Sequence, residues 1–106
     1  MRVATVKNDD GSYEIYFIKL GGWNDFKLIL NTLIEEGQCS VVEEREMVTD
    51  KDVLLKLVDD TFLLSHHYMM GNYLFTQDSK IVPLLEQLAQ NVINCIKQKL
   101  IVKGLL

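Results

Sequence analysis

The stretch from Val53 to Gln77, VLLKLVDDTFLLSHHYMMGNYLFTQ, constrains the fold of this chain more than any other. Aliphatic and aromatic residues dominate it, and two pairs of turn-forming residues interrupt them, Asp59-Asp60 and Gly71-Asn72. Asp, Asn and Gly reach positive φ at low cost, as the central positions of two-residue hairpin loops require. The stretch therefore predicts three antiparallel strands joined by two tight turns.

Counting outward from each turn gives a predicted strand pairing. Leu57 is expected to face Phe62 across the first turn, and Met70 to face Tyr73 across the second. Side chains alternate between the faces of a strand, so this register sorts the stretch onto two faces. The predicted core face carries Val53, Leu55, Leu57, Phe62, Leu64, His66, Tyr68, Met70, Tyr73 and Phe75. The other face is mixed, and its apolar members are Leu54, Val58, Leu63, Met69 and Leu74.

Three more strands are predicted upstream of this stretch, over residues 2–7, 12–20 and 39–48. The second has apolar residues on both faces, which is typical of a central strand covered by helix on one side. The third carries charge from Glu43 to Glu46, so it is expected either at a sheet edge, where charges discourage stray pairing, or exposed to a partner.

Two amphipathic helices complete the predicted elements. Asn24 is a candidate N-cap for the first, and Gly37 is expected to end it in the left-handed conformation. The second is expected to start near Ile81 or Val82 after a cap at Asp78 or Ser79, because Pro83 is tolerated only in a first turn. Its predicted apolar stripe consists of Leu84, Leu85, Leu88, Val92, Ile96 and Leu100.

The element order strand-strand-helix-strand-strand-strand-strand-helix predicts an α+β fold. Its 106 residues, 48% of them hydrophobic, suit one domain spanning 1–106. We expect a single antiparallel sheet of about five or six strands with both helices on one face, because a single sheet offers the helices one face to cover.

Cysteine usage and the absence of targeting patterns favour the cytosol. Cys39 and Cys95 are far apart and form no CxxC pair, which argues against a zinc site or a disulfide framework. No secretory signal pattern opens the sequence, and no apolar run is long enough to span a membrane. No cofactor is expected, because Gly21-Gly22 lacks the rest of a phosphate-binding loop and the aspartates lack calcium-loop spacing.

Negative charge is concentrated in one segment. Residues 43–60 hold seven acidic and three basic side chains, so the net charge of the segment, −4, equals that of the whole chain. Phosphate backbones would be repelled by such a surface, which argues against a nucleic-acid partner and favours a basic protein. The acidic residues are Glu43, Glu44, Glu46, Asp50, Asp52, Asp59 and Asp60.

His66 and His67 are the only histidines. Adjacent residues of a strand point to opposite faces, so the two rings are not expected to share a metal ion or a substrate. His66 is expected in or beside the core, whereas His67 on the mixed face is a candidate binding contact or general base.

In its size, its acidic segment and the turn-linked block VDDTFLLSHHYMMGNYLF, the chain resembles the small acidic immunity proteins of bacterial contact-dependent inhibition and related toxin systems. This resemblance implies a cytosolic inhibitor that binds a toxin domain, often a basic nuclease, and occludes or distorts its active site. It implies no role for any individual residue.

The leading hypothesis is therefore a non-enzymatic inhibitor that binds a toxin domain through the seven acidic residues, with Lys56 and His67 as rim contacts. One alternative is a self-associating structural or adaptor domain, a homodimer formed through the mixed face of the meander or through an edge strand. A second alternative is a small hydrolase or isomerase that uses His67.

Overall fold

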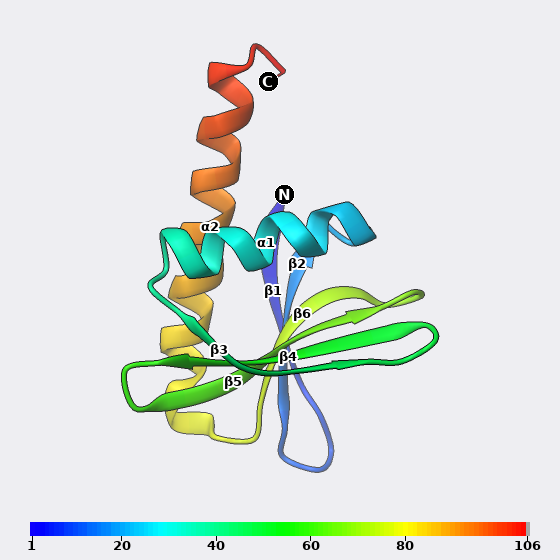
Figure 1. Cartoon of the computed structure of the whole chain (residues 1–106). Coiled ribbons are helices and arrows are strands. Elements are labelled where there is room, and N and C mark those ends of the chain that lie inside the picture. The colour runs from blue at the N-terminus through cyan, green and yellow to red at the C-terminus, as the bar shows by residue number, and fades with distance from the viewer. Residues whose placement is uncertain (106) are drawn as a thin grey trace.

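The computed structural model describes residues 1–105. Over this range the chain forms one six-stranded antiparallel sheet and two α-helices (Figure 1). The strands are β1 (Arg2–Lys7), β2 (Tyr13–Ile18), β3 (Ser40–Glu46), β4 (Asp50–Leu57), β5 (Asp60–His67) and β6 (Gly71–Thr76). The helices are α1 (Trp23–Glu35), the short 3-10 turn η1 (Ser79–Ile81) and α2 (Val82–Val102). The α+β class and the predicted element order are confirmed.

The order of strands across the sheet is β1-β2-β6-β5-β4-β3. Neighbours in the chain are neighbours in the sheet except where β6 pairs with β2 and joins the N-terminal hairpin to the meander. This leaves β1 and β3 at the edges. Every residue of β3 is exposed, which agrees with the edge position that its charged centre predicted.

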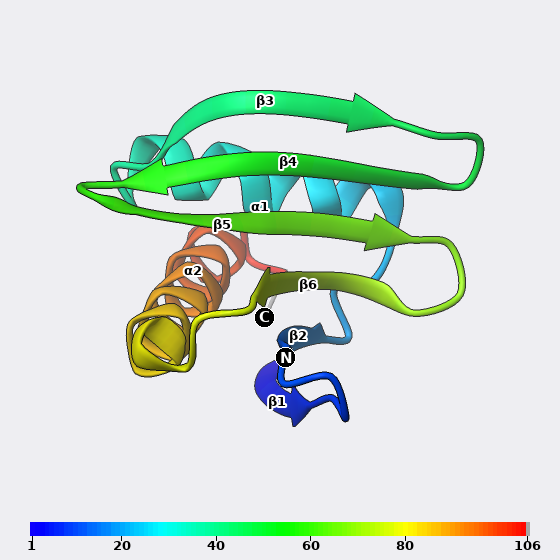
Figure 2. The ribbon, with the colours of Figure 1, turned by 90° about the horizontal axis from the view of Figure 1, so that it is seen from below.

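Both helices lie on the same face of the sheet, here called the helix face (Figure 2). Strand residues on this face are buried against apolar residues of α1 and α2; Ile15, Leu64 and Leu74 are fully inaccessible. The opposite face, here called the outer face, has no helix over it in Figure 2. Its large side chains, Tyr16, Leu54, Leu63, Tyr73 and Phe75, therefore stay partly exposed.

The first hairpin turns one residue earlier than predicted. Leu57 pairs with Asp60, so Val58 and Asp59 form the loop, and Phe62 pairs with Leu55 instead of Leu57. This error shifts the pairing by two residues, and a two-residue shift returns every side chain to the same face. The predicted faces of β4 and β5 are therefore right although the predicted partners are wrong.

The second hairpin also turns earlier than predicted, and this error changes which side chains of β6 face the core. His67 pairs with Gly71, so the loop holds Tyr68, Met69 and Met70, and Gly71 follows it with φ +94°. Phe75 pairs with Leu63 instead of Tyr68, a shift by an odd number of residues. An odd shift moves a whole strand to the other face.

As a result, β6 is inverted relative to the prediction. Tyr73 and Phe75 lie on the outer face, whereas Leu74 and Asn72 are buried on the helix face. The predicted core residues Tyr68 and Met70 lie in an exposed loop.

Both helices start and end slightly differently from the prediction. Gly22, not Asn24, is the N-cap of α1, and its N–H donates to the Asp25 carboxylate at 3.1 Å. The left-handed residue after α1 is Gln38 (φ +60°), not Gly37. In α2, Pro83 sits in the first turn as predicted, and the preceding Asp78 accepts a hydrogen bond from the Lys80 N–H.

The buried stripe of α2 differs at several positions from the predicted one: Val82 and Ala89 are also buried, and Leu100 is only partly buried. Leu84 is 40% exposed, whereas Ile93, which was not expected in the stripe, is fully buried. Over residues 1–105, no helix combines the length and the apolar character that crossing a membrane would require.

Candidate functional site

The pairing of β3, β4 and β5 separates the acidic residues of the 43–60 segment into three groups. On the outer face lie Glu43, Asp50 and Asp52, together with Lys56 and His67. On the helix face lie Glu44, Glu46 and Asp60. Asp59 lies in the β4–β5 turn at the far end of the sheet. The acidic segment is therefore not one continuous wall.

Some of these carboxylates have basic neighbours. Glu44 lies 3.9 Å from the Lys51 ammonium group, and Asp52 pairs in register with Arg45. Ion pairs at such exposure contribute little to stability, but they reduce the local negative charge.

The outer face has a shallow hollow of about 180 Å³ between Leu54, Leu63 and the charged side chains of Glu43, Arg45 and Asp52. Farther along this face Tyr16 and Tyr73 contact each other, with ring centroids 5.0 Å apart. Burial, and then the nearby Glu14 carboxylate, raise the pKa of Tyr16 to about 12. Both phenols therefore stay neutral at ordinary pH, and neither is activated as an acid or a nucleophile.

A different feature stands out at the end of the sheet where the β3–β4 and β5–β6 turns lie side by side (Figure 2). Large apolar side chains are exposed there, including Val48, fully exposed, and Met69, 72% exposed. We call this region the tip surface, and it consists of Trp23, Met47, Val48, Tyr68, Met69 and Met70. Exposed Met and aromatic side chains gathered in one place are typical of protein-binding surfaces.

The tip surface surrounds a pocket of about 360 Å³, here called the tip pocket. Its lining residues are Trp23, Glu46, Met47, Val48, Thr49, Asp50, His66 and Tyr68. Glu46 and Asp50 flank the β3–β4 turn, which is why residues of both sheet faces reach the same pocket. Two acidic residues of the predicted set thus line one largely apolar pocket.

A buried amide holds the wall of the tip pocket in place. Asn72 is 1% exposed, and its Nδ2 donates to the Leu20 carbonyl at 2.7 Å and to the Gly22 carbonyl at 3.0 Å. These bonds fix the loop that precedes Trp23. Gly21 and Gly71 permit this close approach, because a Cβ on either would lie 3.3–3.4 Å from the Cα of the other.

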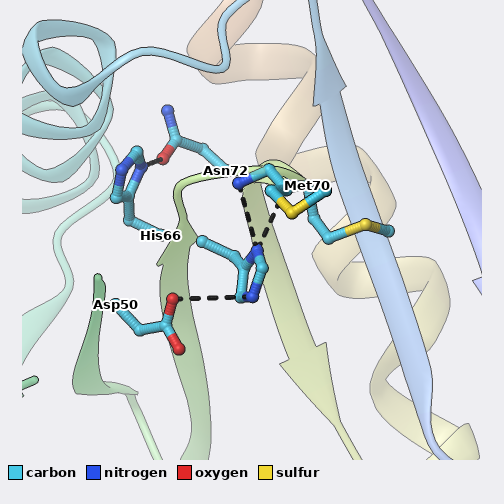
Figure 3. Close-up of polar contacts among 6 residues, drawn as sticks. Asp50, His66, Met70 and Asn72 are labelled. Carbon is cyan, nitrogen blue, oxygen red and sulfur yellow. Dashed lines mark hydrogen bonds and ion pairs between the residues drawn. The ribbon is translucent and has the colours of Figure 1, made fainter. Parts of the chain in front are cut away.

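The same amide assigns the protonation of His66. Because Asn72 Nδ2 donates to two carbonyls, its Oδ1 is the atom that lies 2.7 Å from His66 Nδ1 (Figure 3). An amide oxygen only accepts, so Nδ1 of His66 carries a proton and donates it to Asn72 Oδ1. The His66 ring packs edge-on against Trp23, with centroids 5.3 Å apart, and lines the tip pocket.

His67 points to the other face and shapes the β5–β6 turn. Its Nδ1 accepts from the Met69 N–H at 3.2 Å and from the Met70 N–H at 3.3 Å, while Nε2 faces Asp50 Oδ1 at 3.7 Å (Figure 3). With Nδ1 engaged as an acceptor, the ring fixes the position of the exposed methionines. As predicted, the two imidazoles lie on opposite faces.

Sequence reasoning named Glu46 and Asp50 but missed the apolar half of the tip. Tyr68 and Met70 were expected in the core because the turn was placed at Gly71-Asn72. A three-residue loop closed by a left-handed glycine is a common alternative, and the pair Met69-Met70 directly before Gly71 fits it equally well. This was the one signal that could have predicted the exposed loop.

Searches against protein-family models, curated proteins and solved structures find no match to this chain. Within the described range, no three His, Cys, Asp or Glu side chains are grouped so that they could hold a metal ion. The tip combines exposed apolar side chains with a pocket whose lining includes Glu46 and Asp50.

Proposed function

We propose that this protein binds a basic partner protein through the tip surface and acts in the cytosol as an inhibitor of that partner. In the form suggested by its resemblance to immunity proteins, the partner is a toxin domain that the inhibitor neutralises. The observation that carries this proposal is the gathering of six exposed or half-exposed apolar residues at the tip, four of which line a pocket with Glu46 and Asp50.

The apolar side chains supply the binding energy in this proposal. Burying one Met or Val side chain is worth about 1.5–3 kcal/mol, and a few such anchors dominate most protein interfaces. Methionine also adapts its shape at little cost, so Met47, Met69 and Met70 suit a surface that must fit a partner closely.

The carboxylates supply attraction and orientation. The chain carries a net charge of −4, and all of it arises in the segment that contains the β3–β4 turn. Negative charge around an apolar centre steers a basic partner toward the tip and raises the rate of association, more at low salt than at high salt.

The two alternative functions have less support. His67 Nδ1 accepts two backbone hydrogen bonds, so a hydrolase would have to work with the Nε2 that faces Asp50. The face expected to self-associate loses Leu74, which is buried, and both Val58 and Met69, which lie in turns. Only Leu54 and Leu63 of that set share the outer face.

Size-exclusion chromatography and calorimetry with the product of the neighbouring gene test the proposal. We expect a complex whose affinity falls about tenfold or more in Met69→Ser, because the burial of one methionine is lost. Val102→Ser is the matched control, since Val102 is similarly exposed, at 77%, but lies on the last turn of α2. Equal losses in both variants, or no complex, would contradict the proposal.

A further inference from the structure

We infer that the tip pocket is a receptor for one arginine side chain of the partner protein. This inference rests on the proposed function and names the group that the partner would insert. It follows from three properties of the pocket: the hydrogen-bonding character of its polar groups, its apolar walls and its charge.

The polar side chains of the pocket offer more acceptors than donors. Glu46 and Asp50 line the pocket, which also borders His66; in the neutral form of that ring Nε2 accepts, because Nδ1 donates to Asn72 Oδ1. The side-chain donors are the indole N–H of Trp23 and the hydroxyls of Thr49 and Tyr68, and a hydroxyl also accepts. A ligand with many donors and no acceptor matches this set, and guanidinium is the side chain with that property.

Asp50 shows a related shortage of donors. Its Oδ1 is buried, and among residues 1–105 it has no hydrogen-bond donor; the nearest imidazole nitrogen, His67 Nε2, is 3.7 Å away. A carboxylate left short of donors in the free protein gains from a cation that approaches its other oxygen.

The walls fit the rest of an arginine side chain. Met47, Val48 and Tyr68 provide apolar surface against which three methylene groups can pack while the charged end reaches the carboxylates. A volume of about 360 Å³ lies within the range of ligand-binding clefts.

Charge around the pocket also favours a cation. The Lys51 ammonium group lies over the Trp23 ring, 5.6 Å from the centroid, and 3.9 Å from Glu44. Lys27 lies over the same ring from α1. Two acidic residues, Glu46 and Asp50, line the pocket, and its lining among the described residues includes no Lys or Arg. Arginine is preferred to lysine because its planar fork reaches several acceptors at once and is more weakly hydrated.

A peptide titration tests this without the partner. Trp23 is the only tryptophan and lines the pocket, so its fluorescence reports occupancy. The probes are acetyl-Gly-Arg-Gly-amide and the same peptide with citrulline or lysine in place of arginine. We expect a saturable change in Trp23 fluorescence with the arginine peptide. Binding of the citrulline peptide, which lacks the charge, is expected to be about tenfold weaker, and binding of the lysine peptide is expected to be weaker also.

Substitutions locate the site. Glu46→Gln and Asp50→Asn are each expected to weaken the arginine peptide about threefold to tenfold, because each removes one charge-assisted bond. Glu35→Gln, an exposed carboxylate at the end of α1, is the matched control and is expected to bind as the wild type does. Any one of four results would overturn the inference: no saturable change in Trp23 fluorescence, equal binding of the citrulline peptide, binding of the lysine peptide as tight as that of the arginine peptide, or unchanged affinity in both pocket variants.

The two proposals fail separately. A pocket that binds the arginine peptide while the neighbouring gene product forms no complex would contradict the proposed function alone. A complex whose affinity is the same in Glu46→Gln and Asp50→Asn would contradict the arginine receptor alone.

Discussion

Asn72 is the residue on which the shape of the tip most depends, and replacing it with alanine gives a sharp prediction. Three hydrogen bonds disappear with its side chain: those to the Leu20 carbonyl, to the Gly22 carbonyl and to His66 Nδ1. The Leu20 bond is buried, whereas the other two are partly accessible to water. The buried carbonyl of Leu20, left without a donor, therefore accounts for most of the expected loss of stability.

A buried polar group that loses its partner costs about 1–3 kcal/mol, and one that water can reach costs less. Asn72→Ala is accordingly expected to lower the free energy of unfolding by about 3–5 kcal/mol, a large part of the roughly 5–15 kcal/mol that stabilises a domain of this size. Asn72→Asp keeps the shape of the side chain but turns an oxygen toward two carbonyl oxygens, so it is expected to be no more stable than the alanine variant.

Urea unfolding followed by far-UV circular dichroism measures this difference. The matched control is Asn94→Ala, which removes a side-chain amide that accepts from Gln90 at 3.1 Å on the exposed surface of α2. The control is expected to change stability by less than about 0.5 kcal/mol. A loss in Asn72→Ala as small as that in the control would refute the argument that this amide organises the tip.

Three further predictions concern other parts of the chain. Val58 has φ +58°, a strained conformation for a β-branched residue, and its side chain is 80% exposed. Asn adopts this conformation more easily, so Val58→Asn should raise the free energy of unfolding, measured with urea, by about 1 kcal/mol. A decrease would contradict the claim that Val58 is strained. Burial raises the pKa of the Cys39 thiol to about 11. A thiol reagent at pH 8 should therefore modify Cys95 quickly and Cys39 only when the protein unfolds. Equal rates of modification at the two cysteines would contradict the burial of Cys39. The pKa of Tyr16 is raised from 10.0 to about 12 in the folded protein. Its contribution to stability is therefore complete below pH 10 and is lost as the pH rises toward 12. Tyr16→Phe should lose less stability than the wild type between pH 10 and pH 12.

Local sequence patterns were sufficient for the elements and for half of the sheet register. Periodic apolar residues predicted the strand at Arg2–Lys7 with its observed bounds, and both helices. The faces of β4 and β5 were also right, because misplacing the turn at Val58-Asp59 shifted the pairing by an even number of residues.

The inversion of β6 could not be predicted locally, because the residues that decide it are far away in the chain. Gly71-Asn72 reads equally well as a turn and as the first residues of a strand. Asn72 enters the core because its amide meets the carbonyls of Leu20 and Gly22, about fifty residues away in sequence. A polar residue is buried there only because these partners satisfy it.

The same non-local contact explains why the tip pocket was missed. It joins Trp23 from α1, the β3–β4 turn and the end of β5, three segments that no sequence motif connects. The acidic segment was visible in the composition, but only the fold determines that Glu46 and Asp50 line one pocket with apolar groups while Asp59 lies at the far end.

Hydrogen exchange of the free protein and of its complex with the neighbouring gene product tests the central claim most directly, because it maps the bound surface residue by residue. Binding through the tip surface predicts slower exchange at the backbone amides of 46–50 and 68–71, with the 8–11 and 58–59 turns at the opposite end unchanged. Protection confined to those opposite turns or to α2, with the tip amides exchanging as fast as in the free protein, would contradict it.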